Sequence, residues 1–324
     1  MNFLAFRLAK PFYMFLLLFT LAGCTQSGNN ASLPVPPDEY GAGISSGEVL
    51  VVEPMFPEAE PVISPTPGNS GKNIPVLENN SKLITMYAVA PERNNVKLPK
   101  VSDLEPQIDE YVNTIKKNLD DLDGSIRFAD DADVLYRDAN TLVLLALALG
   151  VSDENNKYKK SAPAIIAAAK KLETAKTFDV AQKAVAELEK SLTVVSASAQ
   201  LKWEKVASLK PLMKAVPNIN NVVKRNLRNE AALKRGTTKV MQGTATLAVI
   251  GQGSVPNADE TTSPDSADEW KKLCYSFRDA ALEVNAKTTA YVDEKATFDD
   301  VDAAFETLSD TCNACHELFF HDVK

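Results

Sequence analysis

The pattern of apolar and polar residues changes near residue 100. Residues 24–100 carry only short apolar patches among many Pro, Gly, Ser and Asn residues, a composition typical of an extended tether. Beyond residue 100, apolar residues recur every three or four positions, which predicts helices with one core-facing stripe. Ser102-Asp-Leu-Glu105 fits a capping box and predicts the start of the first helix. The predicted stripe of this helix consists of Leu104, Ile108, Tyr111, Ile115, Leu119 and Leu122.

Sequence blocks from the first half of the helical region recur, in the same order, in its second half. Residues 113–119 (Asn-Thr-Ile-Lys-Lys-Asn-Leu) recur as residues 221–227 (Asn-Val-Val-Lys-Arg-Asn-Leu), and residues 141–150 are echoed by residues 244–253. Tyr-Lys-Lys and Trp-Lys-Lys open the two predicted third helices, and Phe-Asp opens both fourth helices. Ordered repeats that differ in loop length indicate a tandem duplication of a four-helix unit.

We therefore predict an all-α chain with two tandem four-helix bundles after a disordered N-terminal tether. The predicted bundles span residues 101–200 and 201–324, and the tether spans residues 24–100. Scarce aromatic residues and abundant alanine fit small-residue helix packing better than a β-sandwich. The apolar run 142–149 is too short to cross a bilayer, so it predicts a core helix.

Residues 1–23 have the features of an export signal peptide. Arg7 and Lys10 flank a short apolar run that ends at Leu21-Ala-Gly-Cys24, and the run is shorter than a membrane span requires. The ending resembles the lipobox of bacterial lipoproteins. This resemblance implies a diacylated Cys24 that anchors the protein to a bacterial membrane, on the periplasmic side of the cell envelope. The alternative is cleavage by ordinary signal peptidase beside an incidental cysteine.

Charge and histidine content argue against several classes of function. The net charge of −8 disfavours nucleic acid, which needs a concentrated basic face, and fits an acidic protein that meets basic partners. The chain has two histidines, and no Ser/His/Asp set, phosphate loop or pair of catalytic carboxylates can be assembled. We therefore expect no nucleic-acid partner and no classical enzyme activity.

Cys312-Asn-Ala-Cys315-His316 is a C-x-x-C-H motif in the last predicted helix, and it indicates one covalently bound haem c. The i, i+3 spacing places both sulfurs on one helix face, where they can add to the two vinyl groups of haem. The next residue then brings an imidazole to the iron. A thioredoxin-like redox pair would want a βαβ context, and a zinc site would need about four ligands, with only His321 nearby as a supplement.

The two predicted fourth helices differ at this motif. The first copy has Leu192 and Val195 at the cysteine positions and Ser196 at the histidine position. Leu192 and Val195 are expected to fill core positions there. The first bundle is therefore expected to keep the fold without an anchor for covalent haem.

An alanine-rich four-helix unit with C-x-x-C-H near the end of its last helix resembles the cytochrome c prime family, over roughly residues 203–324. The resemblance implies that Cys312 and Cys315 are the thioether anchors and that His316 is the proximal iron ligand. Members of this family are high-spin with an open iron position, or low-spin with a methionine ligand. Members that bind nitric oxide usually carry a basic residue four positions after the proximal histidine. Phe320 stands there, which argues against that proximal mechanism.

The resemblance leaves the sixth iron ligand open. Low-spin relatives place a methionine on the first helix of the haem domain, where this chain has Met213, and thioether ligation raises the reduction potential. Met213 could instead only pack the bundle. Met241 on the second helix is a weaker candidate. Without either, side chains such as Val222 or Val223 would cover an open position.

Other residues of the second copy have expected roles around the motif. Phe305 and Phe319 lie on the same predicted stripe as the two cysteines and are candidate haem contacts. Trp270 is interpreted as a core residue, and Cys274 as a small apolar core residue. No disulfide framework is indicated, because Cys24 is assigned to lipid and Cys274 then has no obvious partner.

These features predict a c-type cytochrome that carries one haem and transfers single electrons in the cell envelope, to or from a redox partner protein. The alternative is a five-coordinate haem module that binds or senses nitric oxide or carbon monoxide. A third role belongs to the haemless bundle, which would dock a redox partner or form a homodimer.

Overall fold

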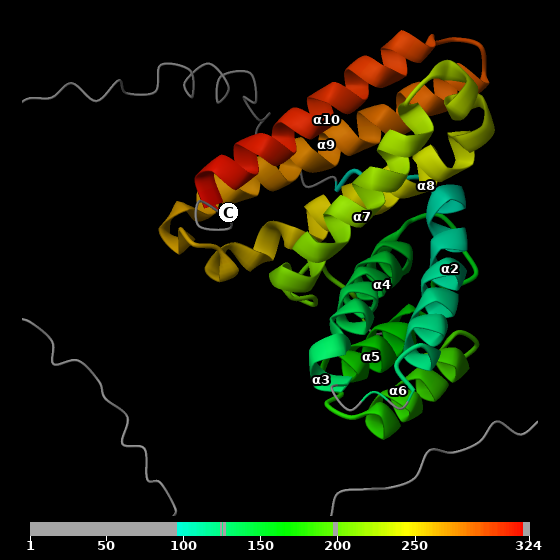
Figure 1. Cartoon of the computed structure of the whole chain (residues 1–324), viewed down its shortest axis with the longest axis vertical. Helices are drawn as coiled ribbons and strands as arrows, with labels where there is room; N and C mark the ends of the chain where they lie inside the picture. Colours follow the sequence, from blue (N-terminus) through cyan, green and yellow to red (C-terminus); the bar gives the residue numbers. More distant parts are fainter. Residues whose placement is uncertain (1–95, 124, 126–127, 197–199, 320–324) are drawn as a thin grey trace, which may run out of the picture. The chain divides into compact units, whose positions relative to one another are not determined.

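Helices account for all regular secondary structure in the described residues (Figure 1). The computed structural model describes residues 96–123, 125, 128–196 and 200–319, and all of them belong to one compact unit. No strand is present among these residues, so the all-α prediction is confirmed. The elements are α2 (Val101–Asp120), α3 (Phe128–Asp131), α4 (Asp133–Val151), α5 (Ala162–Glu173), α6 (Phe178–Ser191), α7 (Leu209–Leu227), α8 (Glu230–Ser254), η1 (Val255–Glu260), η2 (Pro264–Ser266), α9 (Ala267–Val292) and α10 (Phe298–Phe319).

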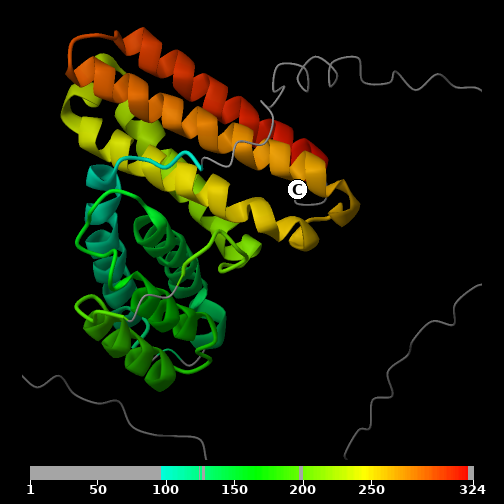
Figure 2. The same ribbon diagram turned by 180° about the vertical axis from the view of Figure 1, so that it is seen from behind.

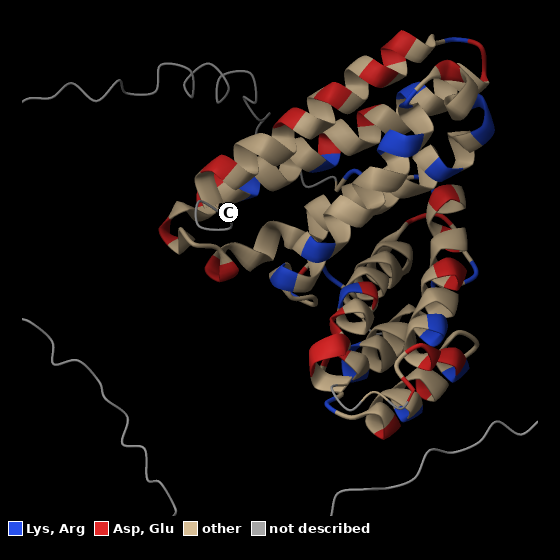
Figure 3. Ribbon diagram, viewed as in Figure 1, with Lys and Arg blue, Asp and Glu red and all other residues tan. Residues whose placement is uncertain are grey.

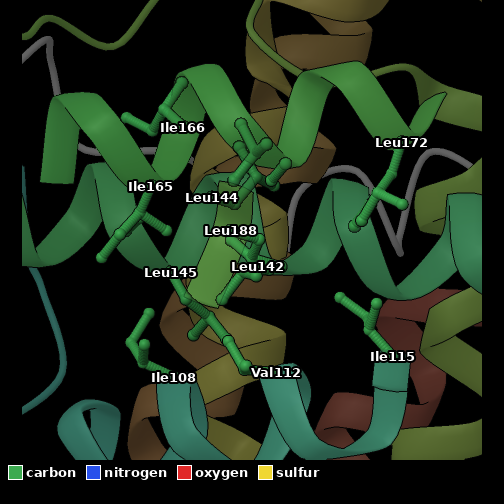
Figure 4. Close-up of a cluster of buried hydrophobic side chains, with 14 of the residues drawn as sticks. Ile108, Val112, Ile115, Leu142, Leu144, Leu145, Ile165, Ile166, Leu172 and Leu188 are labelled. Carbon is green, nitrogen blue, oxygen red and sulfur yellow. The ribbon is translucent and has the colours of Figure 1, made fainter. Parts of the chain in front are cut away.

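The first helix set, defined as α2, α4, α5 and α6, closes on itself. Helix α4 packs against α2 and α5, α5 packs against α6, and α6 lies against α2. The central position of α4 explains its sequence, because residues 142–149 are apolar on every side and all of them are buried. Figure 4 shows ten labelled members of this core: Ile108, Val112, Ile115, Leu142, Leu144, Leu145, Ile165, Ile166, Leu172 and Leu188.

The predicted core helix at residues 142–149 is confirmed as part of α4. Within the described part of the chain, α4 is the one helix that is long and apolar enough to cross a membrane. Most of that helix is buried inside the protein, as expected for the core helix of a folded domain.

The start of α2 differs from the capping-box prediction. The helix begins at Val101, and its N-cap is Lys100, whose side chain makes no cap hydrogen bond. Val101 is buried in the core of the first set, so packing holds this residue in the helix ahead of Ser102. The predicted apolar stripe is confirmed, because four of its six members are buried and the other two pack against the core.

The second helix set, defined as α7, α8, α9 and α10, has a different closure. Helix α8 packs against α7 and α9, and α9 packs against α10; Figures 1 and 2 both show α9 and α10 side by side. Among the described residues, α7 and α10 do not pack closely through their backbones as α2 and α6 do. Side chains of all four helices nevertheless share one buried cluster, which includes Val223, Val240, Val284 and Phe305.

The two helix sets share a core. Gly253 of α8 permits a close approach to α4, because a Cβ atom at this position would lie 2.5 Å from the Cδ2 atom of Leu144. The buried cluster of the first set also continues into α7 and α8. The residues that extend it are Leu212, Ala215, Ala245, Val249 and Ile250.

Two buried polar contacts also join the helix sets. The Asn285 side-chain amide donates to an Asp103 carboxylate oxygen at 3.1 Å, and the Thr246 hydroxyl donates to the Gln107 side-chain oxygen at 3.4 Å. Each buried pair costs roughly 1–3 kcal/mol if one partner is left unsatisfied. These contacts therefore oppose separation of the two sets.

Helix α6 ends before two core positions predicted for it, Leu192 and Val195. Its last residue is Ser191, and Leu192 is only partly buried just beyond that end. The prediction that Val195 fills a core position is wrong, because this side chain is 72% exposed. The backbone has left the helix by this point, where the Ser196 amide donates to the Lys160 carbonyl at 3.0 Å.

We predict that Gly253→Val destabilises the protein, because the added side chain would overlap Leu144 in the packed junction between α4 and α8. Overpacking of this kind costs about 1–3 kcal/mol in the free energy of unfolding, measurable by chemical denaturation. The matched control is Thr238→Val, at an exposed position of the same helix. Equal unfolding midpoints for the two variants would show that the junction is not closely packed.

Candidate functional site

The residues of the C-x-x-C-H motif lie on one surface stripe of α10. Successive helical residues are separated by about 100°, so Cys315 and His316 flank Cys312 at about 60° and 40° on opposite sides. Both cysteines are partly buried, and His316 is exposed. The stripe therefore borders the core on its Cys315 side and solvent on its His316 side. The buried residues nearest to it along α10 are Thr311 and Phe319.

An apolar cluster beneath this stripe brings α7, α9 and α10 together. We call it the site cluster. Met213 and Cys315, both partly buried, pack against it. The structure thus gathers the predicted sixth ligand and one predicted thioether anchor at the same cluster. Its buried members are Leu209, Trp270, Leu273, Cys274 and Phe319.

One hydrogen bond and one ring contact hold the end of α10, and a second hydrogen bond holds the tryptophan that makes the ring contact. The rings of Phe319 and Trp270 meet edge to face, with centroids 5.3 Å apart. The Trp270 indole donates to the Ser254 carbonyl at 2.8 Å, and the Thr262 hydroxyl donates to the Phe319 carbonyl at 2.5 Å. The chain therefore holds the last turn of α10 against the start of α9, immediately after the motif.

Other sequence-predicted candidates lie elsewhere. Phe305 belongs to the buried cluster that Val223 shares, not to the site cluster. The Met241 sulfur accepts a hydrogen bond from the Thr289 hydroxyl at 3.6 Å. Thr289 stands fifteen residues after Cys274 on α9, about 22 Å along a helix axis. The structure therefore does not bring Met241 to the motif.

Burial controls the protonation of the three cysteines near the motif. It raises the pKa of Cys312 to about 11. The pKa of Cys315 is raised to about 12, mainly by burial and to a smaller extent by the neighbouring Cys312. The pKa of Cys274 is also raised well above its ordinary value, mainly by burial and to a smaller extent by the neighbouring Cys315. The thiols are therefore protonated at neutral pH.

The surface of α10 is acidic. Residues 298–319 contain six carboxylates and no Lys or Arg, and Figure 3 shows acidic positions along this helix. In the described ranges, no group of three or more His, Cys, Asp or Glu side chains is arranged to hold a metal ion. The carboxylates are Asp299, Asp300, Asp302, Glu306, Asp310 and Glu317.

The side chains present fit a covalently bound haem. Two thiols on one helix stripe are the groups that form thioether bonds, and the adjacent imidazole is a haem-iron ligand. An apolar cluster with a thioether side chain lies beside them.

Sequence reasoning missed several residues that shape the site, among them Leu209, Leu273 and Thr262. Leu209 is the first residue of α7 and could have been found as the start of its apolar periodicity. Thr262 stands between η1 and η2, where no periodic pattern marks a residue. The core interpretation of Trp270 and Cys274 is confirmed by their burial at 1% and 5% exposure.

Comparison with models of known protein families finds no match, and neither the curated proteins nor the solved structures give a significant match. The resemblance to the cytochrome c prime family therefore stays a prediction that rests on the motif and the internal repeat. Cys24, Phe320 and His321 lie outside the described residues, as do residues 1–95.

We predict that the cysteines of the haem-free folded chain react slowly with iodoacetamide at pH 8. The thiolate is the reactive form, and a pKa of about 11 for Cys312 leaves a thiolate fraction on the order of a hundredfold below that of an unfolded chain. The rate should rise as the pH approaches 11. Mass spectrometry of peptides from folded and urea-unfolded protein measures both rates.

Raised pKa values also predict the pH dependence of stability. The protonated thiols stabilise the folded chain at pH values below their ordinary pKa. This stabilisation is lost as the pH rises through the folded-state pKa, because the unfolded chain ionises first.

For the alkylation experiment, equal rates at pH 8 for the folded and the unfolded chain would contradict the assigned burial of the cysteines.

Proposed function

We propose that the protein is a c-type cytochrome with one haem bound covalently through Cys312 and Cys315 and with His316 as its proximal iron ligand. The observation that supports this most directly is the arrangement of these three side chains on one stripe of α10, beside the site cluster. The expected activity is single-electron transfer. When bound, haem supplies an iron centre that takes up and releases one electron.

The chain's own residues have separable roles in this proposal. Cys312 and Cys315 anchor the cofactor, and His316 holds the iron. Trp270 and Phe319 keep the last turn of α10 in place through their ring contact. The apolar site cluster excludes water on one side, which is one way in which a protein tunes a haem potential.

Met213 is the proposed sixth ligand. It is the one predicted methionine candidate whose side chain packs against the same cluster as Cys315. Met241 is engaged with Thr289 instead. A methionine sulfur opposite a histidine raises the reduction potential and favours electron transfer over capture of small gases.

The two helix sets fit the proposed origin as tandem four-helix bundles, residues 101–200 and 201–324. Each set consists of consecutive helices packed in chain order. The first set lacks the three motif residues and closes through α2 and α6, which supports a first bundle without haem. Its proposed role is to dock a redox partner or to form a homodimer.

The N-terminal sequence supports attachment to a membrane. Residues 1–23 read as a lipoprotein signal peptide, Cys24 as the lipidated residue and residues 24–100 as a tether. The proposed location is the periplasmic side of a bacterial membrane, where c-type haem would meet a redox partner protein. The acidic surface of α10 favours a partner with a basic face.

We predict that the full chain, expressed in a host that loads c-type haem, retains haem colour after denaturation and that Cys312→Ala/Cys315→Ala loses it. Covalent haem is detected by in-gel peroxidase staining. Cys274→Ala is the matched control, because it removes a thiol from the same region without touching the motif, and it should stain like the unmodified chain. Staining of the double variant would overturn the assignment of the anchors.

We predict that Met213→Leu abolishes a low-spin Met/His absorption spectrum and lowers the reduction potential, since leucine preserves most of the packing but has no sulfur. Met241→Leu is the control and should leave the spectrum unchanged. An unchanged spectrum in Met213→Leu would remove Met213 as a ligand. A high-spin unmodified protein that shifts with carbon monoxide would instead favour the gas-binding alternative.

A further inference from the structure

The first half of α7 packs with the first helix set, although the helix belongs to the second set. Leu212 and Ala215 are buried in the cluster that fills the first set. Val223 and Leu227, farther along the helix, are buried in the cluster of the second set. Met213 packs against both the first-set cluster and the site cluster. The side chain proposed as the sixth ligand therefore lies where the first set meets the site.

Pro217 stands where α7 changes its packing partner. Proline has no N–H to donate, so Pro217 cannot bond the Met213 carbonyl four residues earlier, and its ring crowds that carbonyl. Prolines are a common cause of bends in helices for this reason. The two halves of α7 can therefore follow different neighbours, and the half that carries Met213 depends on the contacts that the first set makes with it.

Asn140 of α4 holds the start of this half. The residue is 1% exposed, and its Oδ1 atom accepts a hydrogen bond from the backbone N–H of Ser208 at 2.7 Å. Ser208 is the N-cap of α7. The Nδ2 group of Asn140 donates to the Tyr136 carbonyl at 2.8 Å, so the amide cannot turn away without losing a second hydrogen bond. One buried side chain of the first set thus fixes the first turn of α7.

Two carboxylates hold the same turn from opposite sides. The Ser208 hydroxyl donates to a Glu173 carboxylate oxygen of α5, and the Leu209 backbone N–H donates to a Glu260 carboxylate oxygen of η1 at 2.8 Å. Neither carboxylate is as deeply buried as Asn140. Because water competes less for a buried hydrogen bond, the Asn140 bond is the strongest candidate for the contact that decides where α7 begins.

We propose that the first helix set positions Met213 for the site, with Asn140 as the positioning residue. The part of this inference that concerns the sixth ligand rests on the proposed function. A ligand on a separately held segment binds the iron only for the fraction of time in which that segment occupies the correct place. The haemless set then has a role inside the chain, in addition to any partner that it docks.

The first test uses the full chain produced without haem. Hydrogen exchange measured by mass spectrometry follows residues 213–216, whose amides bond the carbonyls of the first turn of α7. We expect Asn140→Ala to speed their exchange by about tenfold, because one buried hydrogen bond no longer holds the helix start. Unchanged exchange in a folded Asn140→Ala variant would overturn the proposal.

Asn118→Ala is the matched control. The Asn118 side-chain amide donates to an Asp138 carboxylate oxygen at 2.8 Å, a bond between α2 and α4 that stays inside the first set. Its loss should leave the exchange of residues 213–216 unchanged. Equal acceleration in the two variants would show that exchange follows unfolding of the whole first set, and would overturn the specific role of Asn140.

A second variant keeps the test decisive if circular dichroism shows that Asn140→Ala does not fold. Ser208→Ala removes only the hydroxyl that donates to Glu173 and keeps the backbone N–H that Asn140 accepts. We expect it to speed the same exchange by about threefold, the effect of one exposed hydrogen bond. No acceleration in this variant would count against the first set as the support of α7.

The second test uses the haem-loaded full chain and measures its absorption spectrum and its rate of carbon monoxide binding. Asn140→Ala should increase the high-spin fraction and speed carbon monoxide binding by about tenfold, because Met213 would leave the iron more often. Asn118→Ala should match the unmodified chain in both readouts. Equal rates in all three chains would overturn the positioning role of Asn140.

The two tests separate this inference from the proposed function. Faster exchange in Asn140→Ala, combined with a chain that takes up no haem or whose spectrum Met213→Leu leaves unchanged, would refute the proposed ligation and leave the hold of the first set on α7 standing. Faster exchange with an unchanged carbon monoxide rate, in a chain whose spectrum depends on Met213, would refute the positioning role alone.

Discussion

The edge-to-face contact between Phe319 and Trp270 is the interaction on which the geometry of the site depends. The three motif residues stand on the two turns that precede Phe319, near the end of the last described helix. Helix ends fray unless packing or capping holds them. The ring contact is worth about 0.5–1.5 kcal/mol beyond its buried area. The hydrogen bond from Thr262 to Phe319 attaches the same turn to the segment between η1 and η2, and the hydrogen bond from Trp270 to Ser254 attaches α9 to the end of α8.

The fourth helices of the two helix sets, α6 and α10, differ in length and in what they carry. Helix α6 has 14 residues and α10 has 22, so α10 is longer by about two turns. When Phe178 is aligned with Phe298, the motif falls just beyond the point where α6 stops. The first set closes through α2 and α6, and it shares its core with α7 and α8. It therefore supports one flank of the second set without carrying a comparable site.

Sequence periodicity predicted the helices because their apolar residues recur at helical spacing, as the buried Leu104, Ile108 and Ile115 illustrate. It placed the motif on a helix for the same reason. It failed at Val195, because spacing alone does not show where the chain leaves a helix. It also did not predict that Met213 and Cys315, on helices far apart in the chain, pack against one cluster. Such contacts depend on how helices cross, which no local pattern encodes.

The central claim is that one haem is bound covalently to the last helix. Trypsin cuts after Lys295 and leaves residues 296–324 as one peptide with both motif cysteines. Peptide mapping of the full chain from a haem-loading host is therefore the most direct measurement. We expect this peptide alone to carry the mass and the visible absorbance of one haem. An unmodified peptide 296–324, or haem on any other peptide, would contradict the account.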